Sequence, residues 1–286
     1  MDRVKFVKYQ GTGNDFILIE DLYGHFPIQD QEFISILCDR HFGIGADGLV
    51  LCQNSSTADF RMRYFNSDGA EATMCGNALR CLVAFLRDHA MVEKTCKIET
   101  AVGIHGAELL EEGKIAVSLS RPALRKVYKD FYQGGDAYHV FSGVDHLVLM
   151  AQDLSRIDLQ ADGEKFRYDR RFRPSGVNVN FVSYVSGKTF FMRTYEKGVE
   201  SETLSCGTGA IAAAFVLREK LGASVELVQF ASEEILEFSF EIQRVWLKGK
   251  VNRVFEGLII PKKSKNPYDP VHQHKMENMS YANRYP

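Results

Sequence analysis

The chain contains two copies of one local pattern, and this duplication constrains the fold more than any other feature. Residues 75–86 read CGNALRCLVAFL, and residues 206–217 read CGTGAIAAAFVL. Each copy begins an apolar, helix-forming run with Cys-Gly, although helices usually begin at Ser, Thr, Asp or Asn. Because an internal repeat in sequence indicates a repeated structural unit, the pattern predicts two similar halves that build one site together.

The residues that precede the two runs repeat as well. Residues 62–66 read MRYFN, and residues 192–196 read MRTYE. In each copy this strand-like segment is followed by a loop that contains glycine, and a glutamate lies four positions before the cysteine, as Glu71 or as Glu202. The order of strand, loop, glutamate and helix is therefore the same in both copies.

Two homologous domains are the simplest interpretation of this duplication. We expect the first to span residues 1–121 and the second residues 122–252, with residues 253–261 returning to complete the first sheet. The polar segment 262–286 contains three prolines and almost no aliphatic residues. Such a segment cannot bury a core, and we expect it to be disordered.

Short segments in which apolar and polar residues alternate dominate the chain and predict strands. They cover residues 4–7, 16–20, 49–52, 60–65, 114–119, 179–185 and 245–248. Helical patterns are fewer and cover residues 31–39, 76–87, 207–220 and, more weakly, 153–159. Few helices among many strands favour an α+β fold. Because both Cys-Gly helices are apolar on nearly every side, we expect each to lie inside the mostly antiparallel sheet of its own domain.

Composition and charge limit the partners and the compartment. The 286 residues are 45% hydrophobic, enough to bury a full core, and the net charge of −2 offers no basic stripe for nucleic acid. We find no long apolar span and no signal peptide, so we expect no membrane partner and a cytoplasmic location. The six cysteines are expected to be free thiols, and no CxxC pair indicates a zinc site.

The two Cys-Gly helix starts indicate a chemistry. A helix N-terminus leaves N–H groups unpaired and has a partial positive charge, so it binds anions and lowers the pKa of a thiol. Two such helices would place Cys75 and Cys206 on opposite sides of a cleft between the domains. One thiolate can then remove a proton from a carbon while the other thiol delivers a proton to the opposite face. This chemistry is racemisation or epimerisation without a cofactor.

Other cysteines and a histidine have simpler interpretations from the residues alone. A cysteine in an apolar segment is usually a small buried hydrophobic residue, and we interpret Cys38, Cys52, Cys81 and Cys96 in this way. On its own, His146 would be a structural histidine rather than an acid–base group.

Five motifs give the chain a resemblance to a known family. They read GTGNDF at 11–16, RHFGIGADGL at 40–49, FNSDGAEATMCGNALRC at 65–81, NVNF at 178–181 and YEKGVESETLSCGTGA at 195–210. From about Val4 to Gly257 the sequence resembles the diaminopimelate epimerases, cofactor-independent two-cysteine epimerases of lysine and peptidoglycan synthesis. That family's fold, two similar domains that each enclose a central helix, agrees with the duplication.

The resemblance implies a role for each residue at a matching position. Cys75 and Cys206 would be the acid–base pair, one acting on each stereoisomer, while His146 and Glu196 would lie beside them and tune their pKa. The backbone of the two helix starts would hold the α-carboxylate. The implied substrate contacts are Asn14, Asn66, Gly76, Asn77, Asn178, Glu196, Lys197, Gly207 and Thr208. The resemblance also implies a small amino-acid substrate, no cofactor, no metal and a homodimer.

Three positions depart from the usual pattern of the family. Val144 stands where an asparagine is common, Lys197 stands where the family has arginine, and Gly48 stands where many members have glutamine. Lysine keeps the charge but cannot form the bidentate pair that arginine forms with a carboxylate. These changes concern the grip on the distal end of the substrate.

Three functions therefore remain open at this point. The first is epimerisation of LL- and meso-diaminopimelate. The second is racemisation of another amino acid, such as glutamate, histidine or lysine, by the same cysteines. The third is a non-catalytic, thiol-bearing binding or redox protein with the same fold.

Overall fold

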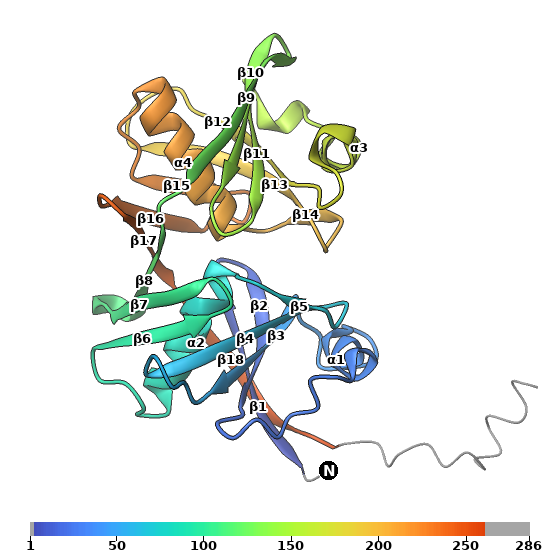
Figure 1. Cartoon of the computed structure of the whole chain (residues 1–286), viewed down its shortest axis with the longest axis vertical. Coiled ribbons are helices and arrows are strands. Elements are labelled where there is room, and N and C mark those ends of the chain that lie inside the picture. The colour runs from blue at the N-terminus through green and yellow to red at the C-terminus, as the bar shows by residue number, and fades with distance from the viewer. Residues whose placement is uncertain (1–2, 261–286) are drawn as a thin grey trace, which may run out of the picture.

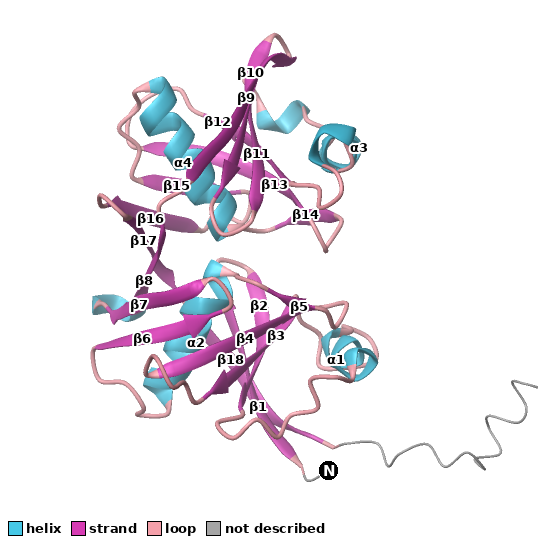
Figure 2. Cartoon of the chain, in the orientation of Figure 1, coloured by secondary structure: helices cyan, strands magenta, loops and turns pink. Residues whose placement is uncertain are grey.

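The computed structural model describes residues 3–260 and contains, within that range, eighteen strands and four α-helices (Figure 2). The polar segment 262–286, which we expect to be disordered, lies outside the described residues. Within residues 3–260, no helix combines the length and the apolar character that crossing a membrane requires.

The first half of the chain runs from β1 to β8 and includes two helices. In order, its elements are β1 (Val4–Gly11), β2 (Asn14–Glu20), α1 (Gln31–Cys38), β3 (Gly48–Gln53), β4 (Phe60–Asn66), β5 (Glu71–Ala72), α2 (Gly76–Asp88), β6 (Thr95–Thr100), β7 (Gly103–Leu109) and β8 (Lys114–Ser120).

The second half runs from β9 to β17, and one further strand follows it. In order, its elements are β9 (Ala123–Tyr132), β10 (Gly135–Phe141), β11 (Asp145–Met150), α3 (Leu159–Arg167), β12 (Asn178–Ser183), β13 (Thr189–Glu196), β14 (Ser201–Thr203), α4 (Gly207–Leu221), β15 (Leu227–Phe230), β16 (Ile235–Phe240) and β17 (Arg244–Lys250). The last strand is β18 (Asn252–Ile259).

Each half wraps its strands around one helix, α2 in the first half and α4 in the second (Figure 1). Residues 76–86 of α2 and residues 207–217 of α4 are all buried. Burial follows from the sequence, because a helix that is apolar on nearly every side has no face to offer to water. The expected α+β fold with a central apolar helix in each half is confirmed.

Strand pairing repeats in the two halves. In the first half β1–β2 is antiparallel, β2–β3 parallel, β3–β4 antiparallel and β4–β6 parallel. In the second half β10–β11, β11–β12, β12–β13 and β13–β15 follow the same sequence of directions. Apart from these four parallel pairs, all pairings among the described strands are antiparallel. The repeat in the sequence is thus a repeat in topology.

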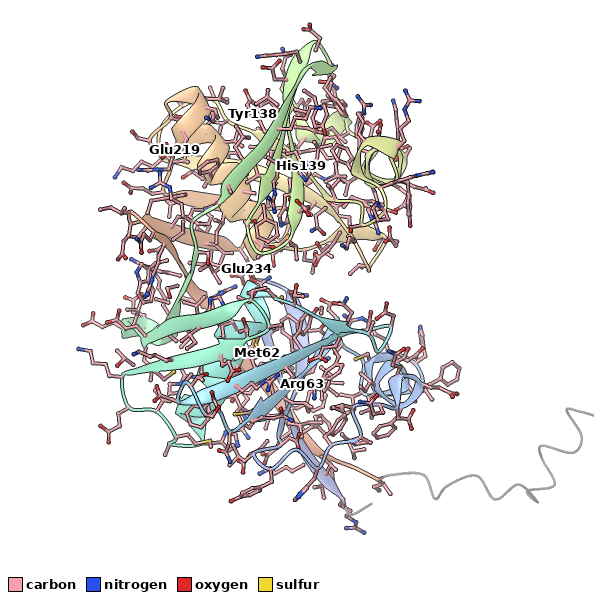
Figure 3. The ribbon with its side chains drawn as sticks, viewed as in Figure 1. Met62, Arg63, Tyr138, His139, Glu219 and Glu234 are labelled. Carbon is pink, nitrogen blue, oxygen red and sulfur yellow. The ribbon has the colours of Figure 1, made fainter. Side chains whose placement is uncertain are left out.

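A matched pair of ion pairs marks the same repeat at the level of side chains. Arg63 on β4, which is labelled in Figure 3, forms a two-pronged pair with Glu71, at 2.7 and 2.6 Å. Arg193 on β13 forms the same pair with Glu202, at 2.8 and 2.7 Å. The glutamate four positions before each cysteine therefore fastens the short strand that leads into the Cys-Gly helix.

Strands at the junction of the halves cross from one to the other. β8 pairs with β17, so the last strands of the two halves lie side by side between α2 and α4 (Figure 1). β9 then joins β10, and β18 joins β1 with Val4 opposite Ile259. The sheet is consequently continuous through both halves. The domain limits at 121, 252 and 261 stay predictions.

One expected helix lies elsewhere, and one strand is shorter. Residues 153–159 form only a short 3₁₀ turn, Leu154–Arg156, and the helix α3 begins at Leu159. The reason is local, because Asp158 caps α3 by accepting a hydrogen bond from the backbone N–H of Ala161. The strand expected over 179–185 ends at Ser183, where β12 stops pairing with β13.

Candidate active site

A cavity of about 270 Å³ lies between the two halves, at the starts of α2 and α4. Its walls come from both halves: Asn14, Tyr64, Asn66, Glu71, Ala72, Thr73, Met74, Cys75, Gly76, Asn77, Val144, Asn178, Glu196, Lys197, Ser205, Cys206, Gly207 and Thr208. Of the site residues expected from the sequence, all line this cavity except His146. The structure therefore brings together residues that lie up to 194 positions apart in the sequence, from Asn14 to Thr208.

The two helix starts converge on one side chain. A Cβ atom placed on Gly76 would lie 3.2 Å from Cδ2 of Leu247, and one placed on Gly207 would lie 3.0 Å from the same atom. Leu247 belongs to β17, one of the two strands at the junction. A side chain at either position would crowd Leu247, so the glycines let both helix starts lie close to this residue.

The two cysteines occupy equivalent positions with different contacts. Each is the N-cap residue of its helix, in an extended backbone conformation. Sγ of Cys75 accepts a hydrogen bond from the backbone N–H of Ala78 at 3.5 Å and faces Oδ1 of Asn14 at 3.8 Å. Sγ of Cys206 makes no capping bond and lies 3.7 Å from Oγ1 of Thr208.

The acidity of the thiols differs from the expectation. Burial raises the pKa of Cys75 to about 12 and that of Cys206 well above its ordinary value. The helix N–H groups, from Ala78 and Asn77 at Cys75 and from Gly209 at Cys206, lower the pKa, but by less than burial raises it. The helix starts thus act in the expected direction, but desolvation is the larger effect and the net shift of both pKa values is upward.

Glu196 supplies a carboxyl group at the cavity wall. Burial raises its pKa to about 7, although a hydrogen bond from Oγ1 of Thr203, at 2.7 Å, favours the ionised form. When ionised, Glu196 raises the pKa of both Cys75 and Cys206 through charge repulsion. The carboxylate thus opposes thiolate formation until a cation neutralises it.

His146 lies behind the cavity wall and reaches the cysteine only through a neighbour. The fully buried ring places Nε2 3.0 Å from Oγ1 of Thr208 and Nδ1 3.1 Å from the amide nitrogen of Asn180. Since that amide can only donate, Nδ1 accepts and Nε2 donates to Thr208. Burial lowers the pKa of His146 to about 3, so the ring is neutral. The expected position beside Cys206 therefore needs correction, because Thr208 lies between them.

Asparagine side chains form the floor of the cavity. Asn14 donates to Asp47 at 2.6 Å, and Asn77 donates to Oδ1 of Asn14 at 3.2 Å and to Oγ of Ser205 at 3.0 Å. Asn178 accepts from the backbone N–H of Lys197 at 2.9 Å. These bonds hold the amide groups in fixed directions at the cavity wall.

Tyr64 is a cavity residue that the sequence interpretation missed. Its ring packs against Gly48, where an added Cβ would lie only 2.6 Å from Cε2 of Tyr64. Among the described residues, its hydroxyl has no hydrogen-bond partner. Because Tyr64 lies two positions before Asn66 on β4, the two side chains share a face of the strand. The two-residue alternation of a strand could therefore have identified Tyr64 from the position of Asn66.

Solved structures with the same fold include epimerases and racemases. A hydroxyproline epimerase from Agrobacterium vitis aligns with a TM-score of 0.72 at 14% identity, covering 92% of this chain and 94% of that one. A phenazine biosynthesis protein of the PhzF family from Bacillus anthracis aligns with a TM-score of 0.70 at 15% identity, covering 91% and 100%. At such identities the likeness concerns the fold alone.

Comparison of sequences identifies the family. A diaminopimelate epimerase from Flavobacterium psychrophilum is 39% identical over 263 residues, which cover 90% of this chain and all of that protein. One from Aquifex aeolicus is 38% identical over 270 residues, covering 89% of this chain and 97% of the relative. The sequence profile described as diaminopimelate epimerase matches residues 6–124 and 138–252. With both halves matched and the two cysteines facing one cavity, the chain belongs to the diaminopimelate epimerase family.

Proposed function

We propose that this protein interconverts LL- and meso-diaminopimelate by moving the proton on one α-carbon, as a step of amino-acid biosynthesis. One observation carries the proposal: two cysteines, each at the start of a buried helix, line a single cavity from opposite halves of the molecule. The names of the relatives supply the substrate, since each is a diaminopimelate epimerase.

The helix starts would bind the α-carboxylate. Backbone N–H groups at Gly76 and Asn77, and at Gly207 and Thr208, lie in the first turns of α2 and α4, where they have no partner within the helix. As the α-proton leaves, negative charge spreads onto the carboxylate. Fixed donors directed at that charge stabilise it most in the transition state.

For each stereoisomer, one cysteine would take the proton from the α-carbon and the other cysteine would return a proton to the opposite face. The thiolate of one cysteine forms an S–H bond as the Cα–H bond breaks, and the electron pair moves into the carboxylate. The thiol of the other cysteine then protonates the opposite face of the carbon and becomes the thiolate. Atoms and charge balance, and the pair of cysteines ends in the reversed protonation state, ready for the other isomer.

The substrate itself would help to form the thiolate. Burial and the Glu196 carboxylate both raise the pKa of the two thiols in the protein without substrate. An ammonium group beside Glu196 would neutralise that carboxylate and remove one of the two obstacles. Lys197, exposed at the rim, would meet the distal carboxylate.

The test is to remove each thiol separately. Cys75→Ala and Cys206→Ala are each expected to abolish net epimerisation while the protein stays folded, because each face of the carbon needs its own acid–base group. Nuclear magnetic resonance in D₂O measures exchange of the α-proton, and chiral chromatography measures the change of stereoisomer. Full turnover by either variant would exclude the two-base mechanism.

A second amino-acid substrate is favoured by three cavity features. Val144 offers no hydrogen bond, Lys197 offers one charged point in place of a fork, and Tyr64 fills the space beside Gly48. Substrate profiling with diaminopimelate, glutamate, histidine and lysine separates an epimerase of diaminopimelate from a racemase of another amino acid. A protein that exchanges no α-proton of any of them would instead be a thiol-bearing binding or redox protein.

We further propose that the protein forms a homodimer through β18 and works in the cytoplasm. Among the described strands, β18 pairs only with β1, so its other edge is open, and it exposes Val254, Phe255 and Leu258. Light scattering should give the mass of a dimer, and Val254→Lys with Leu258→Lys should give a monomer. The cytoplasmic location is supported by all six cysteines being free thiols.

A further inference from the structure

Arg80 is a charged residue in the centre of an apolar helix, and the mechanism above does not use it. Its side chain is fully buried on α2. The guanidinium donates to three neutral oxygens: the backbone carbonyl of Lys250 at 3.2 Å, Oγ1 of Thr12 at 3.0 Å and Oδ1 of Asn77 at 2.7 Å. Within residues 3–260 it has no ion-pair partner, and its Nε has no hydrogen-bond partner. A buried guanidinium without a carboxylate is costly, so it calls for a compensating role.

The surrounding backbone makes room for this guanidinium. A Cβ atom on Gly249 would lie 2.4 Å from Nη1 of Arg80, and one on Gly11 would lie 3.4 Å from Nη2. Thr12, whose hydroxyl accepts from Arg80, has a backbone φ of +57°, an uncommon conformation for a residue other than glycine. Two segments that are distant in sequence, one at residues 11–12 and one at residue 249, thus accommodate one charged group.

The hydrogen bond to Asn77 fixes the direction of an amide at the cavity. Arginine can only donate, so the Asn77 oxygen must point toward Arg80 and its NH₂ group must point away. The NH₂ group then donates to Asn14, which faces Cys75, and to Ser205, the residue before Cys206. Ser205 in turn donates to Thr12 at 3.1 Å, which closes a ring of hydrogen bonds.

The charge of Arg80 acts on the same place. Burial lowers its pKa to about 10, so the guanidinium stays protonated at neutral pH. The titratable groups that face it are Cys75 and Cys81 of α2 and Glu234, which lies at the junction of the halves (Figure 3). Arg80 lies in the second turn of α2, behind the N–H groups that would bind a carboxylate.

We propose that Arg80 is a positioning residue of the reaction: it locks the Asn77 amide between Asn14 and Ser205, and it places a positive charge behind the start of α2. The first part links Cys75, through Asn14, and Ser205, the residue before Cys206, to one hydrogen-bond network across the halves. The second part favours negative charge at Cys75 and on a carboxylate bound beside it. The kinetic part of this proposal rests on the proposed function, whereas the effect on Cys75 does not.

Other groups also act on the acidity of Cys75 and must be held constant. Glu196 of β13, Tyr64 of β4, Cys81 of α2 and Cys206 at the start of α4 all interact with it electrostatically, and each disfavours its thiolate when it is itself ionised. Among the groups that act on Cys75, Arg80 is the cation that lowers its pKa.

The experiment compares Arg80→Met with Arg80→Lys, and uses Arg87→Met, at a half-buried position in the last turn of the same helix, as the control. Two quantities are measured: kcat/KM for diaminopimelate, and the rate at which iodoacetamide alkylates Cys75 from neutral to alkaline pH, followed by mass spectrometry. Thermal unfolding shows that each variant is folded. Arg87→Met should match the wild type in both quantities, because Arg87 pairs only with Asp88 among the described residues.

Arg80→Met should lower kcat/KM by about a hundredfold, since both the amide lock and the charge are lost. It should also slow alkylation of Cys75 at neutral pH by roughly tenfold, because the thiol pKa rises without the cation. Arg80→Lys should keep the alkylation rate within about twofold, because the charge remains. Its kcat/KM should still fall about tenfold, since an ammonium cannot hold the three oxygens in the geometry of a guanidinium.

Several results would overturn the proposal. One is a folded Arg80→Met variant with wild-type alkylation and kcat/KM. Another is an equal loss of kcat/KM in Arg80→Met and Arg80→Lys with an unchanged alkylation rate of Cys75, which would show that Arg80 contributes only through packing. If Arg80→Met does not fold, Arg80→Lys decides, and wild-type kcat/KM in that variant would contradict the amide lock. A wild-type protein that fails to epimerise diaminopimelate would contradict only the proposed function, because alkylation of Cys75 needs no substrate.

Discussion

Two opposing effects act on the pKa of Cys75 and on that of Cys206. The unpaired N–H groups of a helix start favour a thiolate, while the surrounding apolar protein favours a neutral thiol. Burial is the larger effect at both residues and raises both pKa values. Two neighbours modify this balance at the scale of single residues: Glu196 disfavours the thiolate, and the neutral ring of His146 orients Thr208 beside Cys206.

The first prediction concerns Glu196→Gln and its dependence on pH. The pKa of Glu196 is raised to about 7, so its negative charge is present above that pH and absent below it. Removing this charge should lower the pKa of both thiols and speed their alkylation by iodoacetamide roughly three- to tenfold above pH 7. Below about pH 6, variant and wild type should converge, because the glutamate is then neutral.

The control for this prediction is Glu219→Gln. Glu219 lies near the end of α4 and pairs with Arg121 (Figure 3). Glu219→Gln should leave the alkylation rates of Cys75 and Cys206 unchanged. An alkylation rate in Glu196→Gln that equals the wild-type rate at alkaline pH would show that the charge of Glu196 does not reach the thiols.

The second prediction concerns the distal end of the cavity. The double variant Lys197→Arg with Val144→Asn should gain a two-pronged contact and a hydrogen bond to a distal carboxylate. A charge-assisted hydrogen bond is worth ~1.5–3 kcal/mol, so kcat/KM for diaminopimelate relative to glutamate or lysine should rise by about tenfold or more. Competition assays with paired substrates measure this ratio.

The single variant Lys197→Arg separates the two contributions and should give part of the gain. The thiols are untouched, so α-proton exchange at saturating substrate should change less than the ratio. A ratio that stays at its wild-type value would place the distal carboxylate away from Lys197 and Val144.

At the scale of elements, α2 and α4 combine a buried apolar body with a functional first turn. The same short strand, held by an arginine–glutamate pair, leads into each helix. The caps nevertheless differ, because Sγ of Cys75 accepts a capping hydrogen bond from the N–H of Ala78, whereas the N–H of Gly209 favours the Cys206 thiolate without forming a capping bond. Helix stability and catalysis therefore depend on the same atom only at Cys75.

A prediction at this scale separates the helix-capping role of Cys75 from its role in catalysis. Cys75→Ser should lower kcat by at least a hundredfold, because a hydroxyl is a far weaker acid and base than a thiol. The free energy of unfolding should stay equal or rise by ~0.5–1 kcal/mol, since serine is a preferred N-cap and its oxygen accepts more strongly from Ala78. Urea denaturation and steady-state kinetics measure the two effects.

Cys206→Ser provides the comparison, because the sulfur that it replaces makes no capping bond. It should lose activity similarly, and its free energy of unfolding should change less than that of Cys75→Ser. A Cys75→Ser variant that loses more than about 1 kcal/mol of stability would contradict a capping role for the side chain of residue 75.

At the scale of the whole molecule, two similar halves share one cavity and one continuous sheet. β8 and β17 join the halves, and Leu247 of β17 contacts both helix starts. Any movement of one half relative to the other therefore changes the separation of the two thiols.

The whole-molecule prediction uses this coupling. Mild oxidation should join Cys75 to Cys206 when the halves close, since a disulfide requires Cα atoms within about 7 Å of each other. Activity should fall on oxidation and return with a reductant, and peptide mass spectrometry should find the linked pair.

Cys38→Ser is the matched control, because Cys38 is a buried thiol outside the cavity, and it should inactivate on oxidation like the wild type. Inactive oxidised protein in which the disulfide involves Cys38 or Cys96 would show that the two helix starts do not approach each other.

Much of this protein could be derived from its sequence alone. The duplication fixed the two halves, the central helices and the two cysteines, because a Cys-Gly start, an apolar run and a preceding glutamate are local patterns. Family motifs added Asn14, Asn66, Asn77, Asn178, Glu196, Lys197 and Thr208, which all line the cavity. Each of these signals lies within a few tens of residues, where spacing along the chain decides geometry.

Only the tertiary structure decided the rest. The high pKa of the thiols, the neutral state of His146 and the lowered pKa of Arg80 depend on desolvation, which is set by atoms from distant segments. The place of Tyr64 beside Gly48 likewise results from the pairing of β3 with β4. Sequence spacing identifies which residues can react, whereas burial and long-range contacts determine in which charge state they do so.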